Sequence, residues 1–507
     1  MAEAEFLKFL FPFLVVSFFV IRTKWISSLL IFTGYFLGII DYISEKILAT
    51  HIDFFSLLMV DQGILIMAPS VIGPWFCVFL GMLVPMFAII LIRCKFYENT
   101  KVCSVIRDWL DVHWFKTNYF TECIYVLTTC IAVFSCTSVG KAWSGVFSDG
   151  IEYKQLSKCP TDELFARLGV KNNYVFEKDI KAVAGKNIIV IYCESLENGF
   201  IDNRLFPDLM PNLNSLIKSG KFHHYDNYKK SSSAGNTIGA LYATQTSFPC
   251  VFLHNNQNDV FRRFENNGVL SIAKVLHKAG YTNRFLSNSQ LGFGGTGSLM
   301  RALGYDVLEF KDFSIKGERT TWGVHDKVLF DQAKIEFMKL KNTKMPFNLT
   351  LLTVDTHFPD GIPDLAMRNM VAEKYKTSEL EYSINALDYL IGDFCRFVEN
   401  EAGHDNTEII ILGDHPIMGT EDITPVLRTL KKTERNIALL SSKKSRIYDK
   451  SDLLGFYNIP GFILDIANVK HNAVFSNDLI PDMSSEKIRQ NKALFSNLNL
   501  RFAISDN

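Results

Sequence analysis

Residues 186–200, KNIIVIYCESLENGF, pass in one step from a continuous apolar run to a cluster of polar side chains. A run such as NIIVIYC, bounded by polar residues, is typical of a parallel strand that is covered on both faces. Two further segments repeat the pattern, FNLTLLTVDTH at 347–357 and TEIIILGDHP at 407–416. Helical patterns lie between them, including LSIAKVLHKAG at 270–280, which Gly280 closes as a C-terminal stop. Strands that alternate with helices predict a doubly wound α/β domain, with a mostly parallel central sheet flanked by helices.

Each of the three strands ends in polar residues that can take part in chemistry. These residues are Glu194 after the first strand, Asp355, Thr356 and His357 after the second, and Asp414 and His415 after the third. In doubly wound sheets, ligands bind beyond the carboxyl ends of the strands. One acid at a strand end is ordinary, but here all three strands end in this way. The pattern indicates a functional site at this edge of the sheet.

A second unusual stretch is SSSAGNTIGALYATQ, residues 231–245, in which a polar loop leads into an apolar helix at Thr237. Threonine is an ordinary N-cap residue, so Thr237 either caps this helix or acts as a nucleophile. The two roles are compatible, because the N-terminus of a helix favours negative charge and binds phosphate groups.

Two carboxylates and an imidazole at neighbouring strand ends, Glu194, Asp414 and His415, predict a divalent metal site. Mixed oxygen and nitrogen ligands suit Mn²⁺ or Zn²⁺; we favour manganese, with zinc and magnesium as alternatives. A hydroxyl bound to such a metal, here that of Thr237, is acidified and can attack at neutral pH. The alternative is that the acids cap helices and that Asp-His forms a turn. The occurrence of ESLE, GNTIGAL and GDH together, in this order, favours the metal site.

Six motifs resemble, in order, the phosphoglycerol transferase branch of the alkaline phosphatase/sulfatase superfamily. They are NIIVIYCESLE, GNTIGALYATQTSFP, GGTGSLMRALGYD, TWGVHDKVLF, LLTVDTHFPDG and IILGDHP. The resemblance covers about residues 185–470 and is closer to the type that modifies periplasmic glucans. It implies an alkaline-phosphatase/sulfatase-like fold, and Thr237 as the nucleophile that becomes glycerophosphorylated. It also implies that four residues hold the metal: Glu194, Thr237, Asp414 and His415.

The same resemblance makes His357 and Asn236 candidate substrate-binding residues. His357 is also a candidate catalytic residue, which protonates the leaving group or orients the phosphate. Trp322 and Asp326 match a motif that surrounds the site in the family. One departure concerns the stretch before GYD, where glycines replace a Trp-Asn-Arg cluster of lipoteichoic acid synthases. The donor head-group, or the way in which it is bound, therefore stays open.

The first 140 residues hold the long apolar segments, and a spanning helix needs about 20 such residues. The segments are 6–21, 27–43, 54–68, 73–92 and 120–140. We expect five transmembrane helices, with four as the alternative because the third segment is short and contains Asp61. The basic loop between the last two segments belongs in the cytoplasm, whereas Arg22 and Lys24 favour the opposite orientation.

This pattern divides the chain into four parts. They are a transmembrane domain at 1–140, a linker with short helices at 141–184, a sulfatase-like catalytic domain at 185–470 and a C-terminal extension at 471–507. We expect a multi-pass protein of the bacterial inner membrane with its catalytic domain on the periplasmic face. The 53 basic and 53 acidic residues balance, so nucleic acid is not an expected partner.

The predicted activity is transfer of phosphoglycerol from a phospholipid, phosphatidylglycerol, through a phospho-threonine to a cell-envelope glycan. The first alternative is a phosphoethanolamine transferase that modifies lipopolysaccharide. Such enzymes usually carry several disulfides, which the scattered cysteines after residue 141 fit poorly; a pairing among Cys159, Cys250 and Cys395 stays open. The second alternative, a non-catalytic membrane sensor, has no need of a complete metal and nucleophile set. The oligomeric state is not predicted.

Overall fold

The computed structural model describes residues 150–504 except 171–174, 176, 232, 253–260, 262–268, 403–405, 476–479 and 481–482. The apolar segments predicted before residue 141, and thus the transmembrane domain, lie outside the described residues. Within the described ranges, no helix has both the length and the hydropathy needed to cross a membrane. The chain divides into two compact units, Met1–Ile151 and Glu152–Asn507.

The centre of the second unit is a seven-stranded sheet with the strand order β3-β9-β8-β2-β7-β5-β6. Its strands are β2 (Asn187–Cys193), β3 (His223–His224), β5 (Thr282–Ser287), β6 (Asp306–Glu309), β7 (Phe347–Leu352), β8 (Thr407–Gly413) and β9 (Leu439–Ser441). The run β8-β2-β7-β5-β6 is parallel, while β9 and β3 add an antiparallel edge. The prediction of a mostly parallel central sheet is confirmed.

The three strands predicted from the sequence are direct neighbours in this sheet. Ile189 on β2 lies opposite Leu349 on β7 and Ile409 on β8. The six residues of β2 after Asn187 are all buried, which is what a continuous apolar run requires of a strand covered on both faces. The polar residues that follow β8, β2 and β7 therefore emerge side by side at one edge.

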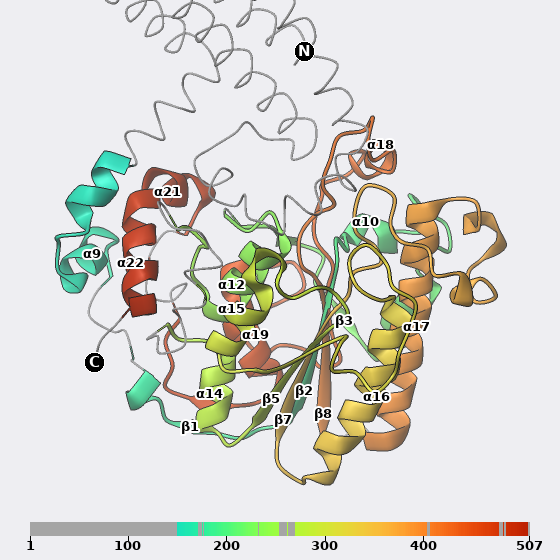
Figure 1. Cartoon of the computed structure of the whole chain (residues 1–507), viewed down its shortest axis with the longest axis horizontal. Coiled ribbons are helices and arrows are strands. Elements are labelled where there is room, and N and C mark those ends of the chain that lie inside the picture. Colours follow the sequence, from blue (N-terminus) through green and yellow to red (C-terminus); the bar gives the residue numbers. More distant parts are fainter. Residues whose placement is uncertain are drawn as a thin grey trace, which may run out of the picture. The chain divides into compact units, whose positions relative to one another are not determined.

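Helices cover both faces of the sheet (Figure 1). On one side lie α12 (Thr237–Thr246), α14 (Ile272–Lys278) and α19 (Ile459–Ile466), with α15 (Thr296–Ala302) beside β6. On the other side lie α16 (Asp326–Asn342) and α17 (Glu379–Ala402), and α11 (Pro211–Lys218) packs against α17. Gly280, with φ of 86°, follows α14 as the predicted stop.

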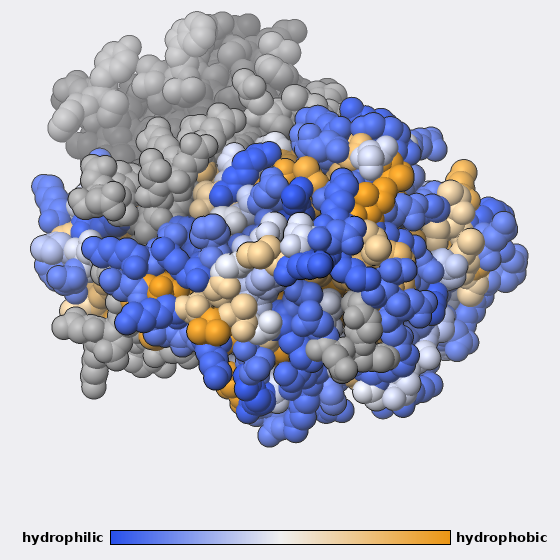
Figure 2. Space-filling view, turned by 90° about the horizontal axis from the view of Figure 1, so that it is seen from below, coloured by the Kyte–Doolittle hydropathy of each residue, from blue (hydrophilic) through white to orange (hydrophobic). Residues whose placement is uncertain are grey.

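Smaller elements complete the unit. Three are short helices, α9 (Thr161–Arg167), α10 (Asn198–Ile201) and α18 (Leu427–Leu430). Five are 3-10 turns: η1 (Glu177–Asp179), η3 (Phe293–Gly295), η4 (Leu365–Met367), η5 (Glu373–Tyr375) and η6 (Phe456–Asn458). Two are strand pairs, β1 (Ala182–Val183) with β11 (Lys470–His471) and β4 (Tyr228–Lys229) with β10 (Leu454–Gly455). On the face seen in Figure 2, hydrophilic residues predominate and apolar residues are scattered.

The C-terminal segment packs on the rest of the second unit. It forms α21 (Ser485–Gln490) and α22 (Lys492–Ile504), and α22 also lies against α9. Asn499 on α22 is fully buried; it accepts a hydrogen bond from the Tyr242 hydroxyl on α12 at 3.0 Å and donates to the carbonyls of Pro249 and Val251. The segment after residue 470 thus helps to hold α12.

Candidate active site

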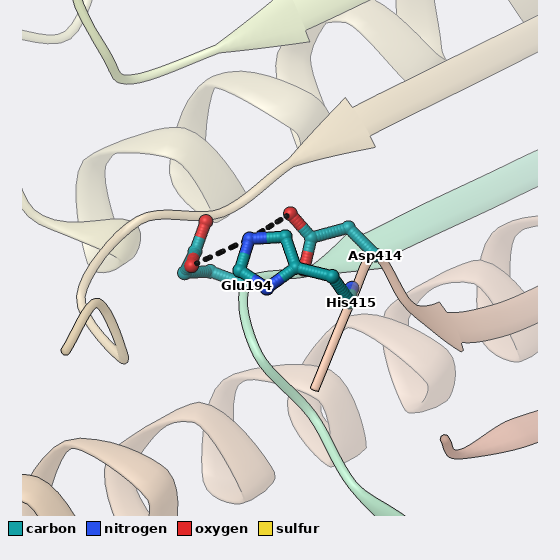
Figure 3. A group of neighbouring side chains, drawn as sticks. All are labelled: Glu194, Asp414 and His415. Atoms are coloured by element: carbon teal, nitrogen blue, oxygen red, sulfur yellow. Dashed lines mark hydrogen bonds and ion pairs between the residues drawn. The ribbon is translucent and has the colours of Figure 1, made fainter. Parts of the chain in front are cut away.

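Glu194, Asp414 and His415 converge at the carboxyl ends of β2 and β8 (Figure 3). One ligand atom from each lies within 4.8 Å of the others. His415 Nε2 lies 3.4 Å from Glu194 Oε1 and 3.5 Å from Asp414 Oδ2. All three side chains are buried. The structure brings together the three residues that the strand ends predicted.

Thr237 joins this cluster from α12. Its Oγ1 lies 3.3 Å from Glu194 Oε2 and 3.4 Å from His415 Nε2. The N-cap of α12 is Asn236, whose Oδ1 accepts the Gly239 amide at 2.8 Å. The helix is therefore capped by the neighbouring residue, and the Thr237 hydroxyl points into the acidic cluster. A side chain at Gly239 would lie within 3.0 Å of both the Ser233 carbonyl and Asn236 Oδ1, so glycine is needed for this cap.

The Asp414 carboxylate is held on one oxygen only. Its Oδ1 accepts the backbone amides of Ser195 at 2.8 Å and His415 at 2.7 Å. Its Oδ2 is buried and accepts no hydrogen bond from the described residues. Burial, with the negative charge of Glu194, raises the pKa of Asp414 to about 7. A buried oxygen without a donor is costly unless a cation or proton satisfies it. This oxygen, with Glu194 and His415, fits a divalent cation.

The His415 ring is oriented for a role as a ligand. Its Nδ1 donates to the Pro416 carbonyl at 2.9 Å, which leaves the lone pair of Nε2 facing the two carboxylates. A backbone carbonyl on the outer nitrogen is a common way to fix a metal-binding histidine. Burial disfavours the charged ring, but Asp414 and Glu194 outweigh this effect and raise the pKa of His415.

Glu194 is fixed by the residues that follow β7. The Thr353 hydroxyl accepts the Glu194 amide at 3.0 Å, and the Thr356 hydroxyl donates to the Glu194 carbonyl at 2.5 Å. The second acid of ESLE, Glu197, has a different function, because it is fully buried in an ion pair with Arg435 and accepts the amide of Ile417 at 2.9 Å. Glu197 therefore stabilises the loop that follows Asp414 and His415.

His357 stands beside the cluster as a neutral ring. It stacks on Trp322 with ring centroids 4.1 Å apart, and its Nδ1 donates to the Phe358 carbonyl at 2.8 Å. Burial, with a smaller effect of His415, lowers the pKa of His357 to about 4. The neutral ring therefore presents the lone pair of Nε2, which accepts a hydrogen bond or a proton. This geometry favours an orienting or proton-accepting role over proton donation.

A pair of buried aspartates links the loops that carry His357 and Trp322. Asp326 accepts the amides of Val354 and Asp355 at 2.8 and 3.2 Å, while Asp355 accepts the amide of Asp326 at 2.9 Å and faces His325 Nδ1 at 3.2 Å. The sequence singled out both aspartates but not this reciprocal contact. Residues near position 326 and residues near position 355 both adjoin the site. This shared location was the available signal that the two segments lie close together.

The remaining candidates lie as follows. Gly294, with φ of 59°, adjoins Ile238, so the glycine-rich stretch that departs from the family lies beside α12. None of the four cysteines among the described residues, namely Cys159, Cys193, Cys250 and Cys395, forms a disulfide.

Comparison with known proteins gives matches in both sequence and structure. The sequence profile of the sulfatase family matches residues 186–492. Phosphoglycerol transferase I of Xanthomonas campestris pv. campestris is 32% identical over 272 residues, which are 51% of this chain and 37% of the relative. The protein of that name from Escherichia coli is 28% identical over 261 residues, 49% of this chain and 33% of the relative. The chain thus spans only about a third of the length of these curated relatives.

Among solved structures, the lipoteichoic acid synthase LtaP from Listeria monocytogenes aligns with a TM-score of 0.49 at 17% sequence identity, covering 68% of this chain and 97% of that one. The matches in sequence confirm the resemblance that the six motifs predicted.

Proposed function

Because the chain belongs to the sulfatase family, we propose that it is a metal-dependent phosphotransferase whose nucleophile is Thr237. The observation that carries this proposal is the placement of the Thr237 hydroxyl against Glu194 and His415, inside a buried cluster of ligands. Asn236 already caps the helix. A capping role for Thr237 therefore does not explain why its hydroxyl faces this cluster.

The donor set fits a divalent cation held by Glu194, Asp414, His415 and Thr237, with manganese favoured and zinc or magnesium as alternatives. When bound, such a cation would lower the pKa of the Thr237 hydroxyl and offset negative charge on the phosphate. The Asp414 Oδ2 atom supports this assignment, because it is buried and accepts no hydrogen bond from the described residues.

The first half of the reaction transfers the head-group to the protein. Thr237 Oγ1 forms a bond to the phosphorus of a phospholipid while the bond from phosphorus to the diacylglycerol oxygen breaks. The hydroxyl proton of Thr237 is given up, and the diacylglycerol oxygen gains a proton. In the second half, a hydroxyl of the acceptor attacks the phosphorus and gives up its proton, while the bond to Thr237 Oγ1 breaks and this oxygen regains a proton. Positioning and charge stabilisation are the main demands of such transfer.

His357 and Asn236 orient the substrates in this proposal. The lone pair on His357 Nε2 accepts a hydrogen bond from a hydroxyl of the head-group or takes the proton of the acceptor hydroxyl. Asn236 uses its Oδ1 in the helix cap, so its amide nitrogen is the atom available to contact a phosphate oxygen.

We propose phosphatidylglycerol as the donor and a cell-envelope glycan as the acceptor. The name shared by the curated relatives, phosphoglycerol transferase I, supports phosphoglycerol as the transferred head-group. The apolar segments before residue 141 support anchoring in the inner membrane, with the catalytic domain on the periplasmic face, because a lipid donor then shares one surface with the enzyme. The alternative donor, phosphatidylethanolamine, is favoured by one observation: the glycine-rich stretch at 292–297 lacks the Trp-Asn-Arg cluster.

The test uses the full-length protein in detergent with Mn²⁺ and phospholipids labelled in the head-group. We expect mass spectrometry to show an adduct of glycerol phosphate on Thr237 when phosphatidylglycerol is supplied. An adduct of phosphoethanolamine would establish the alternative. The absence of an adduct with either lipid, together with unchanged lipids, would contradict the proposed function.

A further inference from the structure

Ser195 occupies a strained position between the two acids of the metal site. It directly follows Glu194 at the end of β2, is 2% exposed, and has a backbone φ of 54°. Residues other than glycine seldom adopt this left-handed conformation, and such strain is typical of functional sites.

This conformation lets one residue contact both carboxylates. The backbone amide of Ser195 donates to Asp414 Oδ1 at 2.8 Å, and its hydroxyl donates to Glu194 Oε1 at 2.8 Å. The second oxygen of each carboxylate remains available. Glu194 Oε2 faces Thr237 Oγ1 at 3.3 Å, and Asp414 Oδ2 accepts no hydrogen bond from the described residues.

From this geometry we infer that Ser195 is the positioning residue of the metal site, orienting both carboxylates so that one free oxygen of each faces the cation. This inference rests on the metal site of the proposed function. Groups that hold metal ligands from behind fix their orientation and raise the affinity for the metal. Since the amide and the hydroxyl act on different ligands, Ser195 also couples the end of β2 to the end of β8.

If the Ser195 hydroxyl had a purely structural role, its loss would affect binding of Mn²⁺ no more than the loss of another buried serine hydroxyl. Ser247 offers the matched comparison, because it is also a buried serine with a left-handed backbone, φ of 64°. Its hydroxyl donates to the Tyr457 carbonyl at 2.7 Å rather than to a carboxylate of the site. Loss of either hydroxyl removes a buried hydrogen bond, but only the Ser195 hydroxyl contacts a metal ligand.

The experiment measures binding of Mn²⁺ alone to the full-length protein by equilibrium dialysis, in the absence of lipid and glycan. We expect Ser195→Ala to weaken binding by about 10- to 100-fold, and Ser247→Ala to leave it unchanged. Ser195→Gly also lacks the hydroxyl but relieves the backbone strain, so it replaces Ser195→Ala if that variant does not fold; we expect the same loss.

Wild-type affinity for Mn²⁺ in either Ser195 variant would overturn the inference, as would an equal loss in Ser247→Ala. Failure of the proposed function is distinguishable, since it would appear as normal binding of Mn²⁺ without transfer of a head-group by the unsubstituted protein.

Discussion

Thr237 Oγ1 lies 3.3 Å from Glu194 Oε2, although the two residues are 43 positions apart in the chain. This contact supports the nucleophilic role that we propose for Thr237. The cap of α12 is Asn236, so the Thr237 hydroxyl is not needed to start the helix. It points instead at the oxygen of Glu194 that Ser195 leaves free.

Substitution of Thr237 should lower the rate of head-group transfer with little effect on the stability of the fold. We expect Thr237→Ala to lower the rate of head-group transfer by on the order of 10³-fold or more, because the attacking oxygen is lost. Its free energy of unfolding should change by less than about 1 kcal/mol, since the cap remains. Thr237→Ser keeps a hydroxyl and should retain measurable transfer. Turnover by Thr237→Ala close to that of the unsubstituted protein would exclude Thr237 as the nucleophile.

Substitution can separate the capping oxygen of Asn236 from its amide nitrogen, which we propose contacts a phosphate oxygen. Asn236→Ser keeps a good N-cap but removes the amide nitrogen, so stability should change little while the KM for the lipid donor rises. Asn236→Ala removes the cap as well and should cost about 1 kcal/mol more in the free energy of unfolding. Unchanged kinetics in Asn236→Ser, measured with the same lipid, would leave Asn236 as a cap only.

The strand pattern was sufficient to predict the core of the fold, because buried parallel strands need continuous apolar runs. NIIVIYC and TEIIILG are such runs, and they pair as β2 and β8. The antiparallel edge could not be predicted in the same way. Its strands, β3 and β9, are two and three residues long, too short to show any periodicity.

The site was predictable where residues follow strands and unpredictable where it depends on backbone conformation. Glu194, Asp414 and His415 were found because parallel strands end at one edge. The left-handed backbone of Ser195 was not, since serine has no preference for it and the amide of Ser195 bonds to Asp414, which lies 219 positions away in the chain. The contact between Asp326 and Asp355 likewise joins residues 29 positions apart.

Removal of the metal should abolish transfer reversibly. We expect EDTA to stop the reaction and Mn²⁺ to restore it, and Glu194→Gln and Asp414→Asn to lower both the bound manganese and the rate. Glu408→Gln is the matched control, because Glu408 is also a buried acid on β8 but pairs with Lys186 at the opposite end of the strand. Activity that survives complete removal of divalent ions, verified by elemental analysis, would contradict the metal site.

The lowered pKa of His357 predicts a loss of stability in acid. The unfolded chain binds a proton on this ring below about pH 6.5, whereas the native ring does so only near pH 4. Stability is therefore lost as the pH falls from about 6.5 towards 4, by about 1 kcal/mol at pH 5.5. His357→Asn removes this contribution and should lose less stability than the unsubstituted protein between pH 7.5 and 5.5. Equal losses, measured by thermal unfolding of both proteins, would mean that His357 titrates normally.

The far end of α12 is anchored by buried hydrogen bonds that centre on Gln245. Its Nε2 donates to the Tyr192 hydroxyl at 3.0 Å, and its Oε1 accepts from the Tyr305 hydroxyl at 2.9 Å. The Tyr192 hydroxyl also lies 2.9 Å from Thr244 Oγ1. Gln245, Tyr192 and Tyr305 are 5% exposed or less, so these bonds form away from water. They fix α12 to the strand that leads to Glu194.

Substitution of Gln245 should therefore affect Thr237 from the opposite end of the helix. Gln245→Met keeps the volume but leaves two buried hydroxyls short of a partner, which should cost about 1–3 kcal/mol of stability. Tyr305→Phe should cost less, and the double variant should cost less than the sum by at least about 0.5 kcal/mol, because both changes remove one shared bond. Strictly additive costs in this double-mutant cycle would show that the bond does not contribute. If it does, kcat should fall in Gln245→Met because Thr237 shifts with α12, whereas Glu194, Asp414 and His415 keep their own contacts outside this helix.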